Sequence, residues 1–160
     1  VAVVDNGFFG MRCTDMLKAH HLDVEVIRAN WGEPPDLHEV ERVVRTGVKS
    51  LVVVHNETST GMTNPMRELA KIAKDHGAWA LCDAVSSLGG IPVPCDAWGI
   101  EAAFAGSQKC IAAPPGIAPT MVSKRLLDEV DPSTVEGWYV IYTRPKPEAE
   151  GACRQDEDLW

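Results

Sequence analysis

The chain has 160 residues, of which 45% are hydrophobic, which is enough for one globular domain with a substantial core. Fifteen basic residues against 23 acidic ones give a formal charge of −8, which argues against a surface for nucleic acid or an anionic membrane. No apolar run approaches the roughly 18 residues of a membrane span, and no signal peptide is visible. Five cysteines without a C-x-x-C motif indicate neither a zinc site nor a disulfide framework, so we expect reduced thiols in an intracellular compartment.

The first part of the chain predicts strands that alternate with helices. Residues 1–4 (VAVV) form an apolar run typical of a buried strand, and DVEVIRA predicts a second one. Between them, helical spacing gives one apolar face, made by Phe9, Cys13, Met16 and Leu17. After two prolines, Asp36 and Glu39 have the spacing of a helix capping box, so we expect the next helix to begin there.

The middle of the chain continues this alternation. SLVVVH is a β-branched run, as expected of a strand covered on both faces, and the polar loop NETSTGMTN follows it. Pro65 suits the first position of a helix that stops at Gly77. AWALCDAV, AAFAG and IAPTMVS predict three further strands. We therefore expect an α/β fold, in which a mostly parallel sheet carries helices on both faces.

The two ends of the chain differ from this pattern. The sequence starts at Val1 within a predicted strand, and we expect it to be a piece of a longer protein. From about Val140 the residues become charged, interrupted by proline and poor in apolar side chains. This composition predicts a flexible tail over residues 140–160, and it leaves residues 1–139 as the folded part.

Four segments with polar or glycine residues follow predicted strands. They are NGFFG after VAVVD, HNETSTG after SLVVV, Asp83 after AWALC, and GSQK after AAFA. In open α/β sheets, ligands bind in the crevice beyond the carboxyl ends of the strands. We therefore expect these segments to converge on one site.

Lys109 lies in GSQKCIAAPPG, between a glycine–serine turn and a double proline. The ordinary interpretation is a solvated surface lysine. Small and apolar neighbours favour a second interpretation, in which Lys109 is partly desolvated and its neutral amine can attack a carbonyl to give a Schiff base. The residues leave both interpretations open. We expect the prolines to fix the loop so that Lys109 points into the strand-end crevice.

Asp83 and Phe9 also have two interpretations each. Asp83 ends an apolar strand, where it either caps a turn or serves as counter-ion to a protonated ring nitrogen, as pyridoxal 5'-phosphate (PLP) requires. Lys109 lies 26 positions later on a neighbouring strand end, which fits that pairing. Phe9 stands between Gly7 and Gly10, where it either fills the core or stacks on a planar ring.

Motifs of other enzyme classes are missing from the sequence. It contains no G-x-G-x-x-G and no G-x-S-x-G, and Ser107 and Lys109 do not have the S-x-x-K spacing. His55 directly follows a hydrophobic strand, and we interpret it as a hydrogen-bonded core histidine and not as a base.

Taken together, NGFFGMR, HNETSTG, DAVSSLGG and GSQKCIAAPPG occur in the order found in one family. The chain resembles the class V PLP-dependent aminotransferases, and among them the alanine–glyoxylate and serine–glyoxylate type. The resemblance runs from Val1 to about Tyr139, and its last two motifs are the most specific. It implies part of the large domain of the PLP-transferase fold, the aspartate aminotransferase-like fold type I.

The resemblance implies a role for each matched position. Lys109 matches the lysine that forms a Schiff base with PLP and then moves the proton between the substrate and the cofactor. Asp83 matches the aspartate that pairs with the pyridinium nitrogen. The other positions matched to PLP contacts are an aromatic residue over the ring, a hydroxyl near the phenolic oxygen, an apolar residue on the opposite ring face and a glutamine near the phosphate: Phe9, Thr58, Val85 and Gln108.

The implied reaction transfers an amino group from alanine or serine to glyoxylate or another keto acid, in a homodimeric parent protein. The family's glycine-rich phosphate-binding turn and its C-terminal small domain have no match here. An inactive fragment therefore stays open, as does a transaminase for 2-aminoethylphosphonate. Cysteine desulfurases fit less well, because they place a histidine where Gln108 stands. Peroxisome and cytoplasm are both compatible with the sequence.

Overall fold

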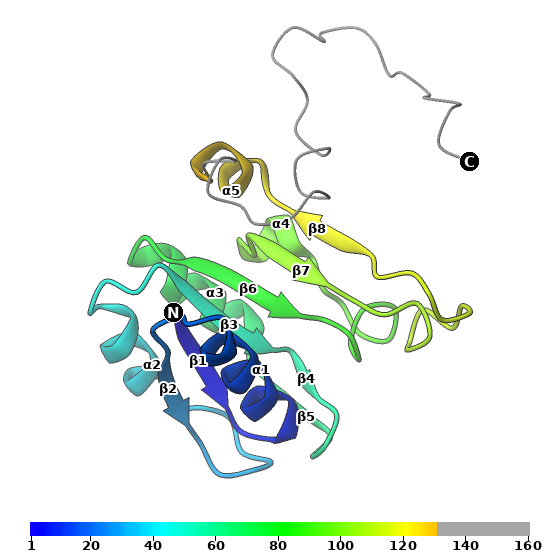
Figure 1. The fold of residues 1–160 in the computed structure, drawn as a ribbon, viewed down its shortest axis with the longest axis horizontal. Helices are drawn as coiled ribbons and strands as arrows, with labels where there is room; N and C mark the ends of the chain where they lie inside the picture. Colours follow the sequence, from blue (N-terminus) through cyan, green and yellow to red (C-terminus); the bar gives the residue numbers. More distant parts are fainter. Residues whose placement is uncertain (131–160) are drawn as a thin grey trace, which may run out of the picture.

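A mostly parallel sheet of six strands forms the centre of the protein (Figure 1). The computed structural model describes residues 1–130. The strands are β1 (Ala2–Asp5), β2 (Glu25–Arg28), β3 (Ser50–Val54), β6 (Trp79–Asp83), β7 (Ala102–Phe104) and β8 (Thr120–Val122). Their order across the sheet is β2-β1-β3-β6-β7-β8, and only β8 runs antiparallel to its neighbour. The predicted strands are thus confirmed.

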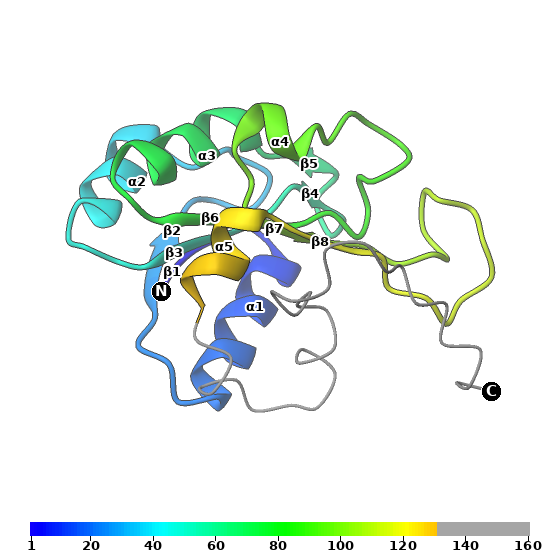
Figure 2. The ribbon, with the colours of Figure 1, turned by 90° about the horizontal axis from the view of Figure 1, so that it is seen from above.

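Helices cover both faces of this sheet. Helices α2 (Leu37–Val44), α3 (Met66–Asp75) and α4 (Cys95–Trp98) lie on one face, while α1 (Phe8–Ala19) and α5 (Lys124–Glu129) lie on the other (Figure 2). This arrangement confirms the predicted α/β class with helices on both sides. Among residues 1–130, no helix combines the length and the apolar character that a membrane crossing needs.

Helix α3 follows its sequence signals closely. Its side chains at Met66, Leu69, Ala70 and Ala73 are all buried against the sheet. Pro65 stands just before its first turn, and Gly77 ends it with a φ of +76°, a left-handed conformation that favours glycine. Local signals were sufficient here because the apolar positions repeat with the helical period.

Two details of the predictions for α1 and α2 need correction, although α2 begins after its N-cap Asp36 as expected. Asp36 Oδ1 accepts a hydrogen bond from the His38 amide at 2.9 Å, so the expected cap of α2 is present. Glu39 binds Arg42 instead of returning to the Asp36 amide, and the capping box is therefore half formed. On α1, the expected apolar face is wrong at Met16, whose side chain is 55% exposed.

Several short elements have no counterpart in the sequence patterns. Strands β4 (Asn56–Glu57) and β5 (Met62–Thr63) form a hairpin inside the polar loop NETSTGMTN. Helices α4 and α5 were not predicted either. The expected change of character near residue 140 lies outside the described residues, so the division into residues 1–139 and 140–160 stays a prediction.

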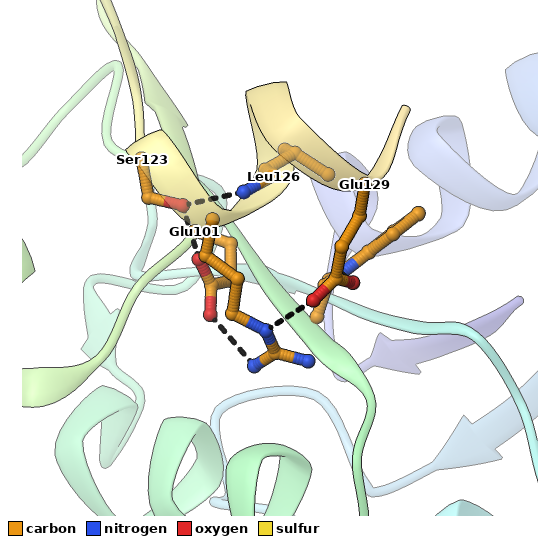
Figure 3. A network of polar contacts seen from close by, with 6 residues as sticks. Glu101, Ser123, Leu126 and Glu129 are labelled. Carbon is orange, nitrogen blue, oxygen red and sulfur yellow. Dashed lines mark hydrogen bonds and ion pairs between the residues drawn. The ribbon is translucent and has the colours of Figure 1, made fainter. Parts of the chain in front are cut away.

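A polar network fastens α5 to the amino ends of β6 and β7 (Figure 3). Glu101 is buried and accepts hydrogen bonds from the Ser123 hydroxyl and, at 3.0 Å, from Arg125 Nη1. Arg125 Nε also donates to Glu129 at 2.8 Å, and Glu129 accepts from the indole N–H of Trp79 at 2.8 Å. Glu101 therefore lies at the end of the sheet opposite to the carboxyl ends of the parallel strands.

The core on β3 gives a stability prediction. Leu51 is fully buried between the sheet and the helices, so Leu51→Ala should lower the free energy of unfolding by about 3 kcal/mol, through lost burial and a residual cavity. Urea unfolding measures the change. Val52→Ala on the same strand is the control, and it should cost clearly less because Val52 is only half-buried. Equal losses would contradict the assignment of the core.

Candidate functional site

Segments that follow β1, β3, β6 and β7 meet at the carboxyl edge of the parallel strands. They enclose a cavity of about 100 Å³. Its walls are made by Phe9, Val54, Asn56, Thr58, Asp83, Val85, Ser86 and Lys109. The expected convergence of the strand-end segments is therefore confirmed, and it follows from the shared direction of the strands.

Asp83 ends β6, is buried and lines this cavity. Its Oδ1 accepts a hydrogen bond from the Val85 amide at 2.9 Å, and no other hydrogen bond reaches the carboxylate within residues 1–130. Burial raises the pKa of Asp83 above its usual range, the Val85 amide opposes this, and the negative charge of Glu57 adds to the rise. A cationic ligand nitrogen in the cavity would relieve this cost.

Lys109 lines the cavity, but its surroundings differ from those expected. Its side chain is exposed, so of the two interpretations left open by the sequence the structure favours the solvated lysine over the partly desolvated one. The apolar stretch after Lys109 is mostly exposed as well, because the chain loops away from the sheet there. Sequence composition does not distinguish these cases, since small apolar residues occur both in cores and in exposed loops.

The loop around Lys109 is closed by Ser107. The buried Ser107 donates from its hydroxyl to the Pro114 carbonyl at 2.6 Å, and its amide donates to the Ile117 carbonyl at 3.0 Å. The Lys109 amide donates to the Gly106 carbonyl at 3.1 Å and makes a tight turn. These bonds, which join both ends of the loop, hold the position of Lys109 more directly than the exposed prolines do.

Two hydroxyl groups form another part of the cavity wall. Thr58 Oγ1 and Ser86 Oγ share a hydrogen bond of 2.5 Å. Ser86 was not among the predicted site residues, and its only signal in the sequence is its place directly after Val85 in DAVSS. The pair joins the loop after β3 to the loop after β6.

Phe9, Val85 and Gln108 are the remaining predicted site residues. Phe9 is half-buried in the first turn of α1, and both it and Val85 line the cavity. Gln108 is exposed and is not part of the cavity wall. Its side chain turns back toward Gly106, where a Cβ would lie 2.9 Å from Gln108 Oε1. The structure thus brings all the predicted residues except Gln108 to one cavity.

His55 directly follows β3, where its amide donates to the Asp83 carbonyl at 2.9 Å, and it is 2% exposed. Its Nδ1 shares a 3.0 Å hydrogen bond with Ser87 Oγ, and its ring meets Trp98 edge to face at 5.7 Å. These contacts confirm the interpretation of a core histidine. Burial lowers the pKa of His55 below its ordinary value of 6.5.

This burial predicts a pH dependence of stability. Since the unfolded chain binds a proton at His55 more readily than the folded one, stability is fully present above pH 6.5 and falls as the pH drops toward the lowered pKa. The slope from His55 is at most about 1.4 kcal/mol per pH unit. Urea unfolding between about pH 7.5 and about pH 5.5 should show this loss in the native sequence. His55→Gln should remove it, and an unchanged slope in that variant would refute the assignment.

The structure also reveals Glu57 as a buried member of the site's surroundings. Glu57 accepts hydrogen bonds from the amides of Phe9 and Gly10 at the start of α1. The sequence indicates only a polar loop residue at this position. No local pattern could reveal these contacts, since the partners lie 48 and 47 residues apart in the chain.

The sequence of this chain is similar to those of known proteins. A family model described as aminotransferase class-V matches residues 9–149. An uncharacterized aminotransferase of Methanocaldococcus jannaschii is 40% identical over 74% of this chain and 31% of its own length. A 2-aminoethylphosphonate–pyruvate transaminase of Vibrio cholerae is 36% identical over 79% of this chain and 35% of its own length.

Solved structures of aminotransferases also match this chain. The crystal structure of an alanine–glyoxylate aminotransferase from Nostoc sp. matches with a TM-score of 0.75 and 36% identity, over 79% of this chain and 34% of that one. The ureidoglycine–glyoxylate aminotransferase of Bacillus subtilis matches with a TM-score of 0.76 and 31% identity, over 79% of this chain and 33% of that one. The chain thus spans about a third of the length of the relatives that it matches.

Proposed function

Because this chain belongs to the class-V aminotransferase family, we propose that it is the cofactor-binding part of a PLP-dependent transaminase. The observation that carries the proposal is the convergence of Phe9, Thr58, Asp83, Val85 and Lys109 on one cavity. These residues come from four different strand ends, and the family resemblance matches each of them to a contact with PLP.

The groups around the cavity suit the chemistry of the PLP ring. A buried carboxylate with one unengaged oxygen, Asp83, can hold a proton on the ring nitrogen. The hydroxyl pair of Thr58 and Ser86 can donate to the phenolic oxygen, and the exposed amine of Lys109 is free to react with an aldehyde. When bound, PLP supplies an electron sink that makes the Cα proton of an amino acid removable.

Each residue of the cavity would have its own task. Lys109 would bind the cofactor covalently, and its released amine would move the proton at the substrate Cα. Phe9 and Val85 would confine the ring from the cavity walls. Gln108, which lies just outside the wall, remains our proposal for a phosphate contact. Lys109 is the only basic side chain among the residues that line the cavity. These residues therefore provide more contacts for the PLP ring than for its phosphate group.

For the substrates, we propose alanine or serine as amino donor and glyoxylate or another keto acid as acceptor. The similarity to the alanine–glyoxylate aminotransferase of Nostoc sp. supports this choice. A second candidate donor is 2-aminoethylphosphonate, supported by the 36% identity with the Vibrio cholerae transaminase. The chain covers about a third of these relatives, so substrates and the implied homodimer are proposals for the whole protein.

Covalent trapping tests the cofactor assignment. We expect the purified chain, incubated with PLP and reduced with borohydride, to carry the label at Lys109. Peptide mapping compares Lys109 with other exposed lysines such as Lys71 and Lys124. Labelling spread evenly over the exposed lysines, or no labelling, would refute the proposed site and would favour a fragment without cofactor function.

Half-reactions then separate the donors. The PLP-loaded protein is mixed with alanine, serine or 2-aminoethylphosphonate, and conversion of the cofactor to its amine form is followed by absorption. Faster conversion by alanine or serine supports the glyoxylate-type assignment. Faster conversion by 2-aminoethylphosphonate supports the second candidate and excludes the first.

A further inference from the structure

Glu57 is a completely buried carboxylate that joins two separate segments of the chain. Its Oε2 accepts hydrogen bonds from the amides of Phe9 at 3.1 Å and Gly10 at 3.0 Å. Its Oε1 accepts from the amide of Ser59 at 3.1 Å and from the Ser59 hydroxyl at 2.6 Å. The Ser59 oxygen in turn accepts from the amide of Phe8 at 3.0 Å. Oε2 thus binds the segment at the start of α1, and Oε1 binds the segment that contains Ser59.

Both segments contribute a wall of the candidate site, whereas Glu57 itself does not line it. Phe9 lines the cavity from the first turn of α1, and Thr58 lines it from the turn between Glu57 and Ser59. The carboxylate therefore lies behind the site and can act on a ligand only through its neighbours. Its two oxygens accept hydrogen bonds from the segment that carries the Phe9 wall and from the segment that carries the Thr58 wall.

The start of α1 depends on this distant carboxylate. The N-cap residue, Gly7, has no side chain to cap the helix, and the first turn holds no acidic residue. A negative charge at this end satisfies free amides and complements the helix dipole. Gly7 makes the approach feasible, because a Cβ at this position would lie 2.3 Å from Glu57 Cγ. The occupied amides of Phe9 and Gly10 are also unavailable to a ligand anion.

We propose that Glu57 is a positioning residue, which sets the separation of the Phe9 and Thr58 walls through one shared carboxylate. The proposal rests on the PLP-binding function proposed above. A purely stabilising cap would affect unfolding alone, whereas a positioning residue also controls ligand binding at walls that it does not itself form.

The test uses Glu57→Gln in the full chain. Glutamine keeps the shape but offers an oxygen to only one segment, and it turns an N–H₂ group toward the donors of the other. PLP should bind about tenfold more weakly, the effect expected for one charge-assisted hydrogen bond. The amides of Phe9 or Ser59 should also exchange with deuterium about tenfold faster, as expected when a hydrogen bond of that strength is lost.

Glu101→Gln is the matched control. Glu101 is also a buried carboxylate with hydrogen-bond partners (Figure 3). It directly precedes β7 and therefore lies at the end of the sheet opposite to the site. We expect this variant to lose stability with unchanged affinity for PLP. If Glu57→Gln does not fold, Ser59→Ala removes the two hydrogen bonds of the hydroxyl, one to Glu57 and one from the Phe8 amide, and PLP affinity should fall in the same direction.

Three results would overturn the proposal. The first is a PLP affinity of Glu57→Gln equal to that of the native sequence. The second is unchanged amide exchange at both Phe9 and Ser59 in Glu57→Gln. The third is a loss of PLP affinity in Glu101→Gln as large as that in Glu57→Gln. If the native sequence forms no PLP adduct at Lys109, the proposed function fails separately. In that case only amide hydrogen–deuterium exchange at Phe9 and Ser59 tests the positioning role. Faster exchange in Glu57→Gln supports the role, and unchanged exchange overturns it.

Discussion

In the Lys109→Ala variant, borohydride reduction should leave no PLP adduct at the candidate site, and no half-reaction should be detectable. Lys109 is the only lysine among the residues that line the cavity, so no neighbouring amine can replace it there. The side chain is exposed, and none of the ion pairs among residues 1–130 includes it. Unfolding by urea should therefore be unchanged, which separates loss of chemistry from loss of structure.

Lys124→Ala provides the matched control for this substitution. Lys124 is also exposed, but it lies on α5, where it pairs with Asp128 at 2.7 Å. This variant should keep the adduct at Lys109. If Lys109→Ala retained a PLP adduct of equal yield, the cofactor would be held by another amine, and the assignment of the site would be wrong.

The fold and the location of the site could be predicted because their signals are local. Helix α3 shows its buried residues by their spacing and its end by Gly77. The alternation of strands and helices predicts parallel strands, and parallel strands place their carboxyl ends at one edge. Phe9, Thr58 and Asp83 each follow or end such a strand, so their meeting at this edge could be expected from the sequence. The roles of these residues toward PLP remain proposals.

Other parts of the site depend on contacts between distant segments, which leave no local pattern. Glu57 and Phe9 are 48 residues apart, and their hydrogen bond requires the segments after β1 and β3 to be adjacent. The hydroxyl pair of Thr58 and Ser86 spans 28 residues in the same way. The exposure of Lys109 could not be decided from the sequence for another reason: apolar neighbours indicate desolvation only if the segment packs on the sheet, and here most of the segment is exposed.

Asp83→Asn should slow the half-reaction of the PLP-loaded protein by about 10³-fold, the scale on which one preorganised electrostatic partner acts in enzyme sites. Asparagine keeps the oxygen that accepts from the Val85 amide, so the turn after β6 should stay in place. It carries no negative charge, however, and cannot hold a proton on the ring nitrogen of PLP. Stopped-flow absorption with saturating amino donor measures the rate.

The same substitution should stabilise the PLP-free protein, and this opposite effect makes the prediction specific. Burial raises the pKa of Asp83 above its ordinary value of 3.8, so stability is fully present below that value and falls as the pH rises through the raised pKa. Asparagine does not ionise, so Asp83→Asn should lack this loss and unfold at a higher urea concentration at pH 7. Asp36→Asn, at the exposed cap of α2, should change neither rate nor stability, since asparagine caps helices equally well. A variant at Asp83 that was both slower and less stable would indicate a disrupted turn, and one with an unchanged rate would show that another carboxylate serves the ring nitrogen.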